Sequence, residues 1–158
     1  MVSDPKKMKI SNFEAREITL ANHPTNDLGT RTVMVDDVLL ISGSDAKQMK
    51  VGENVRLLGL GIVKITNLTD QIDAELVDDS EKAEKKIQWV AGKDALQIKV
   101  IVPDLLFINE EFNKDSLQPH EVITESAYSN LKDDAEIQFV RLGYYRKESS
   151  HQAIFTHK

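Results

Sequence analysis

Cysteine is absent from this chain of 158 residues, which excludes disulfide bonds and metal sites built on thiolates. The histidines lie too far apart to predict a local zinc motif. They are His23, His120, His151 and His157. The chain also lacks any run of about 18 apolar residues and any apolar leader after Met1, so we expect a cytoplasmic protein without a membrane span.

Positive charge is scarce as well, since the formal net charge is -6. Phosphate neutralisation by lysine and arginine dominates most nucleic-acid binding, so this balance predicts weak binding of RNA by the chain alone. The charge is unevenly distributed. The segment 70–84 is acidic. The segment 141–158 contains only one acidic residue but four basic ones, Arg141, Arg146, Lys147 and Lys158. This contrast predicts a local basic face near the end of the chain.

Catalytic motifs are missing too. The chain has no glycine-rich phosphate loop, no His-Glu helix motif and no plausible Ser/His/Asp set. Adjacent carboxylates such as Asp36 and Asp37 fall on opposite strand faces or in turns, where they serve solvation. We therefore expect no catalytic site and no cofactor on this chain.

Alternating apolar residues and turn signals dominate what is present and predict an all-β fold. The expected strands are 32–35, 38–41, 55–66, 73–77, 87–90, 95–102, 122–124, 136–142 and 153–156. Two short helices are expected, near 44–50 and 125–131. A shift in the apolar phase around Gly59 and Gly61 indicates a bulge or sharp bend, which favours antiparallel barrels over a sandwich.

The segment 138–146, which reads QFVRLGYYR, sets an amide and a guanidinium beside aromatic rings. Such a β surface offers hydrogen bonds and stacking planes to unpaired bases. The alternative is that Phe139, Tyr144 and Tyr145 are ordinary strand residues that pack a core.

This segment resembles the QFxRxGY signature near the C-terminus of glutaminyl-tRNA synthetases and of the related archaeal and eukaryotic glutamyl-tRNA synthetases. Further segments resemble the same family in the same order and together cover almost the whole chain. They are DPKKMKI at 4–10, NHP at 22–24 with GTR at 29–31, VGENVRL at 51–57, KIQWV at 86–90 and DLLF at 104–107.

The resemblance implies two small β-barrels, related to a ribosomal-protein barrel, in the anticodon-binding region of a larger synthetase. It predicts that residues 1–40 with 120–158 form a proximal barrel and 41–119 a distal one. The start on the DPKKMKI segment predicts a fragment, and the ATP and magnesium of the catalytic reaction would belong to the missing catalytic domain. The HIGH-like and KMSKS-like motifs of that domain are absent here.

In the resembling family, the residues that match Gln138 and Arg141 contact the middle anticodon base, a uracil. A separation of three places two side chains on opposite faces of a regular strand, so a break near Leu142 and Gly143 would have to bring them together. The alternative is a solvated strand edge.

Lys47 and Gln48 match a Lys-Arg pair that contacts the third base, a guanine, in glutaminyl enzymes. Gln48 replaces the arginine fork and tolerates more than one base, so it favours a glutamate-specific or relaxed reader. Arg56 matches one of two arginines near the first base, and Leu58 replaces the second. The alternative for the helix residues is a merely solvated face.

Arg31 and either Thr25 or Asn26 match a loop near the anticodon, although an ordinary salt bridge is an equal alternative for Arg31. Trp89 alternates with Ile87 and is expected in the core. The resemblance thus implies the tRNA-binding part of a glutamate-tRNA ligase, expected to be monomeric and compatible with both glutamate and glutamine tRNAs. A glutaminyl-tRNA synthetase fragment, a free-standing ribosomal RNA-binding barrel and a protein-interaction barrel remain the alternatives.

Overall fold

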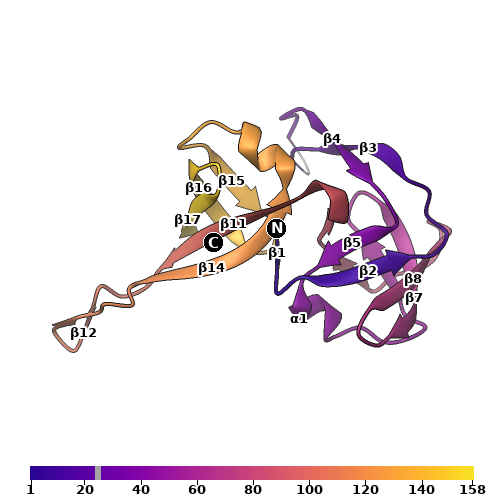
Figure 1. Cartoon of the computed structure of the whole chain (residues 1–158), viewed down its shortest axis with the longest axis horizontal. Coiled ribbons are helices and arrows are strands. Elements are labelled where there is room, and N and C mark those ends of the chain that lie inside the picture. The colour runs from indigo at the N-terminus through magenta and orange to yellow at the C-terminus, as the bar shows by residue number, and fades with distance from the viewer. Residues whose placement is uncertain (24–25) are drawn as a thin grey trace. The chain divides into compact units, whose positions relative to one another are not determined.

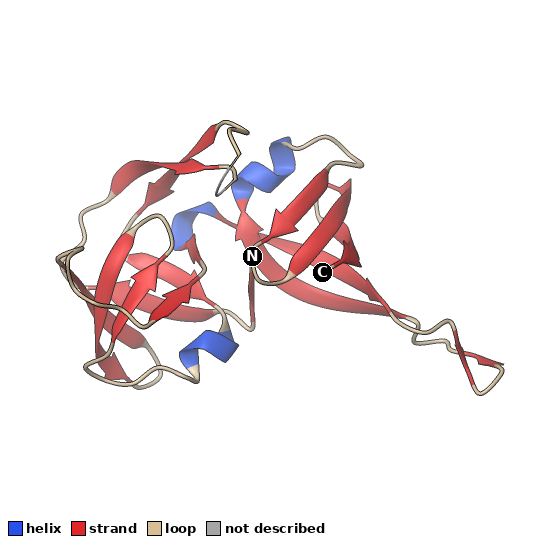
Figure 2. Ribbon diagram, turned by 180° about the vertical axis from the view of Figure 1, so that it is seen from behind, coloured by secondary structure: helices blue, strands red, loops and turns tan. Residues whose placement is uncertain are grey.

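The computed structural model describes residues 1–23 and 26–158 and consists mainly of strands with a few short helical turns (Figure 2). Contacts divide the chain into an N-terminal unit, Val2–Ala95, and a C-terminal unit, Leu96–Lys158 together with Met1. This grouping places residues 2–40 with 41–95, which differs from the predicted division at 1–40 with 120–158. The all-β class is confirmed.

The strands of the N-terminal unit are short and follow one another closely along the chain (Figure 1). They are β1 (Val2–Ser3), β2 (Lys6–Ile10), β3 (Arg16–Ala21), β4 (Thr30–Val35), β5 (Val38–Ile41), β6 (Asn54–Leu57), β7 (Gly61–Leu68), β8 (Ile72–Val77), β9 (Lys85–Ile87) and β10 (Trp89–Ala91). The helical turns α1 (Gly43–Ala46) and η1 (Gly92–Asp94) complete it. Strands β3 and β4 form a separate hairpin.

Seven strands of this unit form one sheet in the order β10-β5-β2-β8-β7-β6-β9. Its two edge strands, β9 and β10, are consecutive in the chain and separated by Gln88 alone. The sheet therefore curls until its edges nearly meet, as a barrel requires. The pairings of β2 with β8 and of β6 with β9 are parallel, which corrects the prediction of purely antiparallel strands. Alternation reports burial and carries no information on strand direction.

The barrel core takes residues from every strand of the seven-stranded sheet. Met8, Ile10, Leu57 and Ile65 are fully buried, and each contributes about 1.5–3 kcal/mol through the burial of its side chain. The Trp89 side chain is buried among them and its Nε1 donates to the Leu58 carbonyl at 2.9 Å. The prediction that Trp89 belongs to the core is confirmed.

A tight turn between β6 and β7 lies where the apolar phase shifts. The predicted strand 55–66 is two strands, and Gly59 and Gly61 both have positive φ. A Cβ on Gly59 would lie 2.6 Å from Leu20 Cδ2, so this glycine also lets the β3–β4 hairpin approach the turn. The expected bulge or bend within one strand is therefore a chain reversal between two paired strands.

The C-terminal unit contains β11 (Ala95–Pro103), β12 (Phe107–Ile108), β13 (Glu111–Phe112), β14 (Leu117–Glu125), β15 (Glu136–Phe139), β16 (Gly143–Ser149) and β17 (Gln152–His157), with the helical turn η2 (Ser126–Asn130) after β14. Its strands lie in the order β14-β11-β17-β16-β15, and β11 pairs with β17 in parallel. Strands β11 and β14 run together into an arm that ends at the β12–β13 hairpin (Figure 1).

Aromatic contacts form much of the smaller core of this unit. The Tyr145 ring packs edge-on against Phe139, with centroids 5.1 Å apart, and against Phe155, with centroids 5.4 Å apart. Ile98, Val100 and Val122 are also buried there. The rings thus pack together across the adjacent strands β15, β16 and β17 and join the β15–β16 hairpin to β17.

Candidate nucleic-acid interface

Gln138 lies on β15 with its side chain exposed. Its neighbours Ile137 and Phe139 are half-buried and buried, so strand alternation directs Gln138 away from the core. Its partner across the ladder is Tyr144 of β16. The amide is therefore presented on the outer side of a strand whose inner side is anchored by Phe139.

Arg141 lies in the turn that follows β15. The strand ends at Phe139, the Leu142 N–H donates to the Phe139 carbonyl at 2.8 Å, and Arg141 itself has φ of 72°. This left-handed backbone conformation removes Arg141 from the strand, so strand alternation does not set the direction of its side chain. The predicted break exists, but it begins before Leu142.

Gly143 closes the turn at a point that tolerates no side chain. Its φ is +123°, and a Cβ would lie 2.7 Å from the His157 carbonyl oxygen of β17. The hairpin can therefore sit close to β17 only because position 143 is glycine. Gln138 and Arg141 thus share one short hairpin of fixed backbone.

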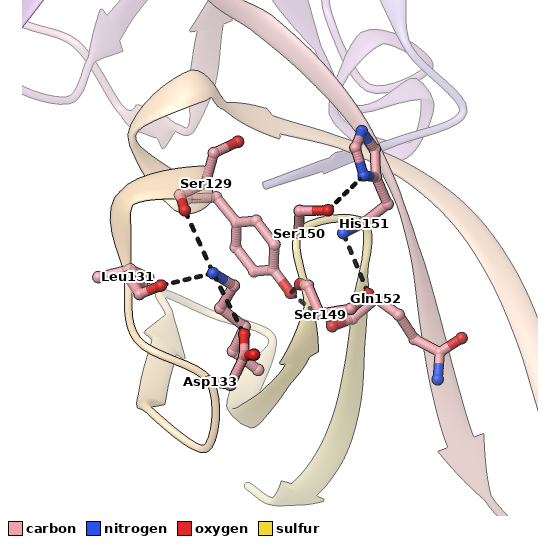
Figure 3. Close-up of polar contacts among 9 residues, drawn as sticks. Ser129, Leu131, Asp133, Ser149, Ser150, His151 and Gln152 are labelled. Carbon is pink, nitrogen blue, oxygen red and sulfur yellow. Dashed lines mark hydrogen bonds and ion pairs between the residues drawn. The ribbon is translucent and has the colours of Figure 1, made fainter.

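A buried lysine anchors the segment that leads into this hairpin. The Lys147 side chain of β16 is 4% exposed, and its ammonium donates to the carbonyls of Ser129, at 3.2 Å, and Leu131 and lies 3.6 Å from Asp133 (Figure 3). The Tyr128 hydroxyl donates to the carbonyls of Ser149 and Gln152. These bonds join residues 128–133 to β16 and to the first residue of β17.

The predicted basic face is smaller than the sequence indicated. Lys147 is buried, so it contributes no surface charge. Arg146 lies 2.6 Å from Glu148 and 3.8 Å from Asp134, which offsets its charge. Paired charges of this kind attract phosphate less than the sequence count implies.

Lys47 and Gln48 follow α1, which is a single turn and shorter than the predicted helix. Both side chains are exposed, while the next residue, Met49, is buried in the barrel core. Lys85 of β9 donates to the Gln48 carbonyl and forms an ion pair with Glu53 at 2.7 Å. These contacts attach the segment that carries Lys47 and Gln48 to β9 and to the barrel core.

The Lys85–Glu53 pair is partly buried. Burial of the carboxyl acts to raise the Glu53 pKa, but the hydrogen bond from Lys85, the Lys50 N–H and the charges of both lysines outweigh it, and the pKa lies below its ordinary value. Glu53 therefore stays ionised at neutral pH and keeps Lys85 in place. Lys85 was missed from the sequence, because a Lys-Lys pair at a strand start carries no signal for an inward contact.

Arg56 lies on β6 and is engaged by the acidic loop after β8. Its Nη1 donates to Asp79 Oδ1 at 2.9 Å, and its Nη2 donates to the Asp79 carbonyl at 3.4 Å. Asn54, two residues earlier on the same face, donates to Glu81 at 3.4 Å. The guanidinium of Arg56 is thus already paired with Asp79, and RNA would have to compete with Asp79 for it.

Arg31 lies on β4 of the β3–β4 hairpin, where its Nη1 donates to the Ala21 carbonyl at 2.8 Å. Leu20, its partner across the hairpin, contacts Gly59 of the β6–β7 turn. Thr25, the remaining predicted contact, lies outside the described residues. Within the N-terminal unit, β9 links Lys47 and Gln48 to β6, which carries Arg56.

No three His, Asp or Glu side chains among residues 1–23 and 26–158 gather closely enough to hold a metal ion. In that part of the chain, no helix has the length and apolar character needed to cross a bilayer.

The sequence is similar to known proteins along almost its whole length. The family model described as tRNA synthetases class I (E and Q), anti-codon binding domain, matches residues 1–84, and a second model with the same description matches residues 86–148. The glutamate-tRNA ligase of Nitrosopumilus maritimus is 48% identical over the whole chain, and that of Cenarchaeum symbiosum is 37% identical over 99% of it. The glutamine-tRNA ligase of Cronobacter sakazakii is 27% identical over 95% of the chain.

The chain spans 28% of the length of each archaeal relative and 34% of the bacterial one. Both family models describe an anticodon-binding domain, and together they match residues of both units. The chain therefore belongs to the anticodon-binding domain family of the class I tRNA synthetases for glutamate and glutamine.

Proposed function

We propose that this chain reads the anticodon of glutamate tRNA for a glutamate-tRNA ligase. The observation that carries the proposal is the β15–β16 hairpin, which presents the exposed Gln138 amide on a rigid strand and Arg141 in the adjoining turn. Unpaired bases are read by such groups on fixed strands. The rest of the ligase would supply the site for ATP and Mg²⁺, and we propose a cytoplasmic, monomeric protein.

The assignment to glutamate rests on the relatives and on two residues of the N-terminal unit. The relatives with 48% and 37% identity are both glutamate-tRNA ligases. Gln48 and Leu58 lack the guanidinium groups that the glutaminyl pattern has at these positions, and Gln48 can donate to or accept from more than one base. We therefore propose that glutamine tRNAs also bind.

A glutamine-tRNA ligase is the second candidate, favoured by the match to the enzyme of Cronobacter sakazakii. It requires selection of guanine at the third anticodon position, for which an arginine fork is the better donor. The two candidates therefore differ in their preference for the third base. Binding of glutamate and glutamine anticodon stem-loops at low salt distinguishes them.

The function is tested by replacing the middle uracil of the stem-loop with adenine and by the variants Gln138→Ala and Arg141→Ala. Each lost base contact should cost about 1–3 kcal/mol, which is roughly ten-fold or more in affinity. In the full-length ligase, kcat/KM for tRNA should fall to the same extent. Gln118→Ala, an exposed amide of β14, is the matched control. Full uracil preference in both variants would exclude the assigned roles.

A further inference from the structure

Gln138, Tyr144 and His157 form one row across strands β15, β16 and β17. Gln138 pairs with Tyr144, and Tyr144 pairs with His157. Direct partners on neighbouring strands project from the same face of a sheet. Gln138 and His157 are exposed and Tyr144 is half-buried, so this row lies on the outer face, opposite the aromatic core.

The two rings of the row are stacked. The centroids of Tyr144 and His157 are 4.5 Å apart, and their planes differ by 9°. The two rings are direct cross-strand partners and nearly parallel. Their faces are therefore turned toward each other along the row. One face of Tyr144 is therefore covered by His157, and its opposite face is turned toward β15, where the next residue of the row is Gln138.

The backbone holds Tyr144 in this position. The pairing of β16 with β17 shifts register between Tyr144 and Tyr145, and the Thr156 hydroxyl donates to the Tyr144 carbonyl at 3.0 Å. The preceding residue, Gly143, also lies so close to β17 that no side chain fits there. Among the described residues, no hydrogen bond holds the Gln138 side chain, so its amide is available for a ligand.

We propose that Tyr144 is the stacking surface for the anticodon base whose edge Gln138 reads, with His157 as its support. The inference rests on the proposed function and adds two residues to it. A base that extends the Tyr144–His157 stack lies above Gln138 and directs its edge toward the Gln138 amide, which both donates and accepts. Stacking holds any base, and the amide then selects among bases.

His157 acts as a positioning residue in this arrangement. Tyr144 is only half-buried, and a ring stacked on one side loses less conformational freedom when a base covers the other side. Removal of His157 should therefore weaken base binding, but by less than removal of the Tyr144 ring that touches the base.

The experiment is an NMR titration of the chain, at low salt, with synthetic glutamate anticodon stem-loops whose middle nucleotide is uridine, adenosine or abasic. Tyr144→Leu should weaken binding of the uridine stem-loop roughly five- to a hundred-fold, and Tyr144→Phe should keep it within about two-fold. The affinity of His157→Ala for the uridine stem-loop should lie between those of Tyr144→Leu and Tyr144→Phe. The abasic stem-loop should bind the wild type and Tyr144→Leu equally, because it has no middle base to stack.

Two controls separate stacking from folding. The amide spectrum of Tyr144→Leu must match that of the wild type, and Phe107→Leu removes an exposed ring outside the row. If Tyr144→Leu weakens all three stem-loops equally, or leaves the uridine stem-loop unaffected while Gln138→Ala abolishes uracil preference, the stacking role is wrong and the proposed function stands. If the wild type does not distinguish uridine from adenosine, both fail.

Discussion

The two units differ in how their sheets close and in how their cores are built. The N-terminal sheet curls until its edge strands nearly meet, and its core takes apolar residues from all of its strands. The C-terminal sheet stays open, has a smaller core rich in aromatic rings, and extends into an arm with Leu105, Phe107 and Phe112 exposed. There, the buried Lys147 ammonium and Tyr128 hydroxyl also donate to backbone carbonyls of neighbouring segments. Directed hydrogen bonds thus supplement a smaller apolar core.

The largest effect on stability is expected from removing a buried apolar side chain from the core of the N-terminal unit. Leu57→Ala removes a fully buried side chain of β6 and should lower the free energy of unfolding by about 2–5 kcal/mol. Val51→Ala, at an exposed position, is the control. Urea unfolding followed by Trp89 fluorescence reports on this unit, since Trp89 lies in its core. If Leu57→Ala lost less unfolding free energy than Val51→Ala, the described difference between the two units would be contradicted.

An intermediate effect is expected from the lysine anchor of the open unit. Lys147→Met keeps most of the apolar stem but leaves the carbonyls of Ser129 and Leu131 without their donor, which should cost about 1–3 kcal/mol. Lys132→Met, at an exposed position, is the matched control. Amide hydrogen exchange should rise in residues 129–135 first. Unchanged protection there would show that packing alone orders the segment.

The smallest effect is expected from the tyrosine hydroxyl and depends on pH. Burial, with the Asp133 and Glu148 carboxylates, raises the pKa of Tyr128 to about 12 from its ordinary value of 10.0. The folded state thus holds the proton more tightly, so this stabilisation is complete below pH 10.0 and is lost as pH rises toward about 12.

Tyr128→Phe tests this dependence. It should cost about 1–2 kcal/mol at neutral pH, because the Ser149 and Gln152 carbonyls lose a donor. Above pH 10.0, its free energy of unfolding should fall less steeply than that of the wild type. Parallel pH curves for the two proteins would show that the hydroxyl is not the titrating group.

Sequence patterns predicted much of the strand content. The predicted strands 38–41, a continuous apolar run, and 95–102, where Leu96, Ile98 and Val100 alternate with polar residues, were found as β5 and β11. Strand β2 was missed because its segment, KKMKI, shows few apolar residues. Strand β16 was missed because the turn at Arg141 interrupts a run that reads as one strand, and because Lys147 occupies an inward position where alternation predicts an apolar residue.

The candidate site was predictable in part. The segment around Gln138 and Arg141 was identified from residue types, and the structure places both on one hairpin. The engagement of Arg56 by Asp79 and the stacking of Tyr144 on His157 were not predictable. Each joins residues separated by at least 13 positions, and no local pattern specifies such a pairing.

The sequence by itself determined the all-β class, a break in the apolar pattern at Gly59 and Gly61, and the segments that carry the family resemblance, because alternation and turn chemistry act over a few residues. Only the tertiary structure decided that β9 and β10 close a barrel, that Lys147 is buried rather than basic surface, and that Gln138, Tyr144 and His157 share one row. These features depend on strand register between distant segments, and that register is set by the packing of the whole sheet.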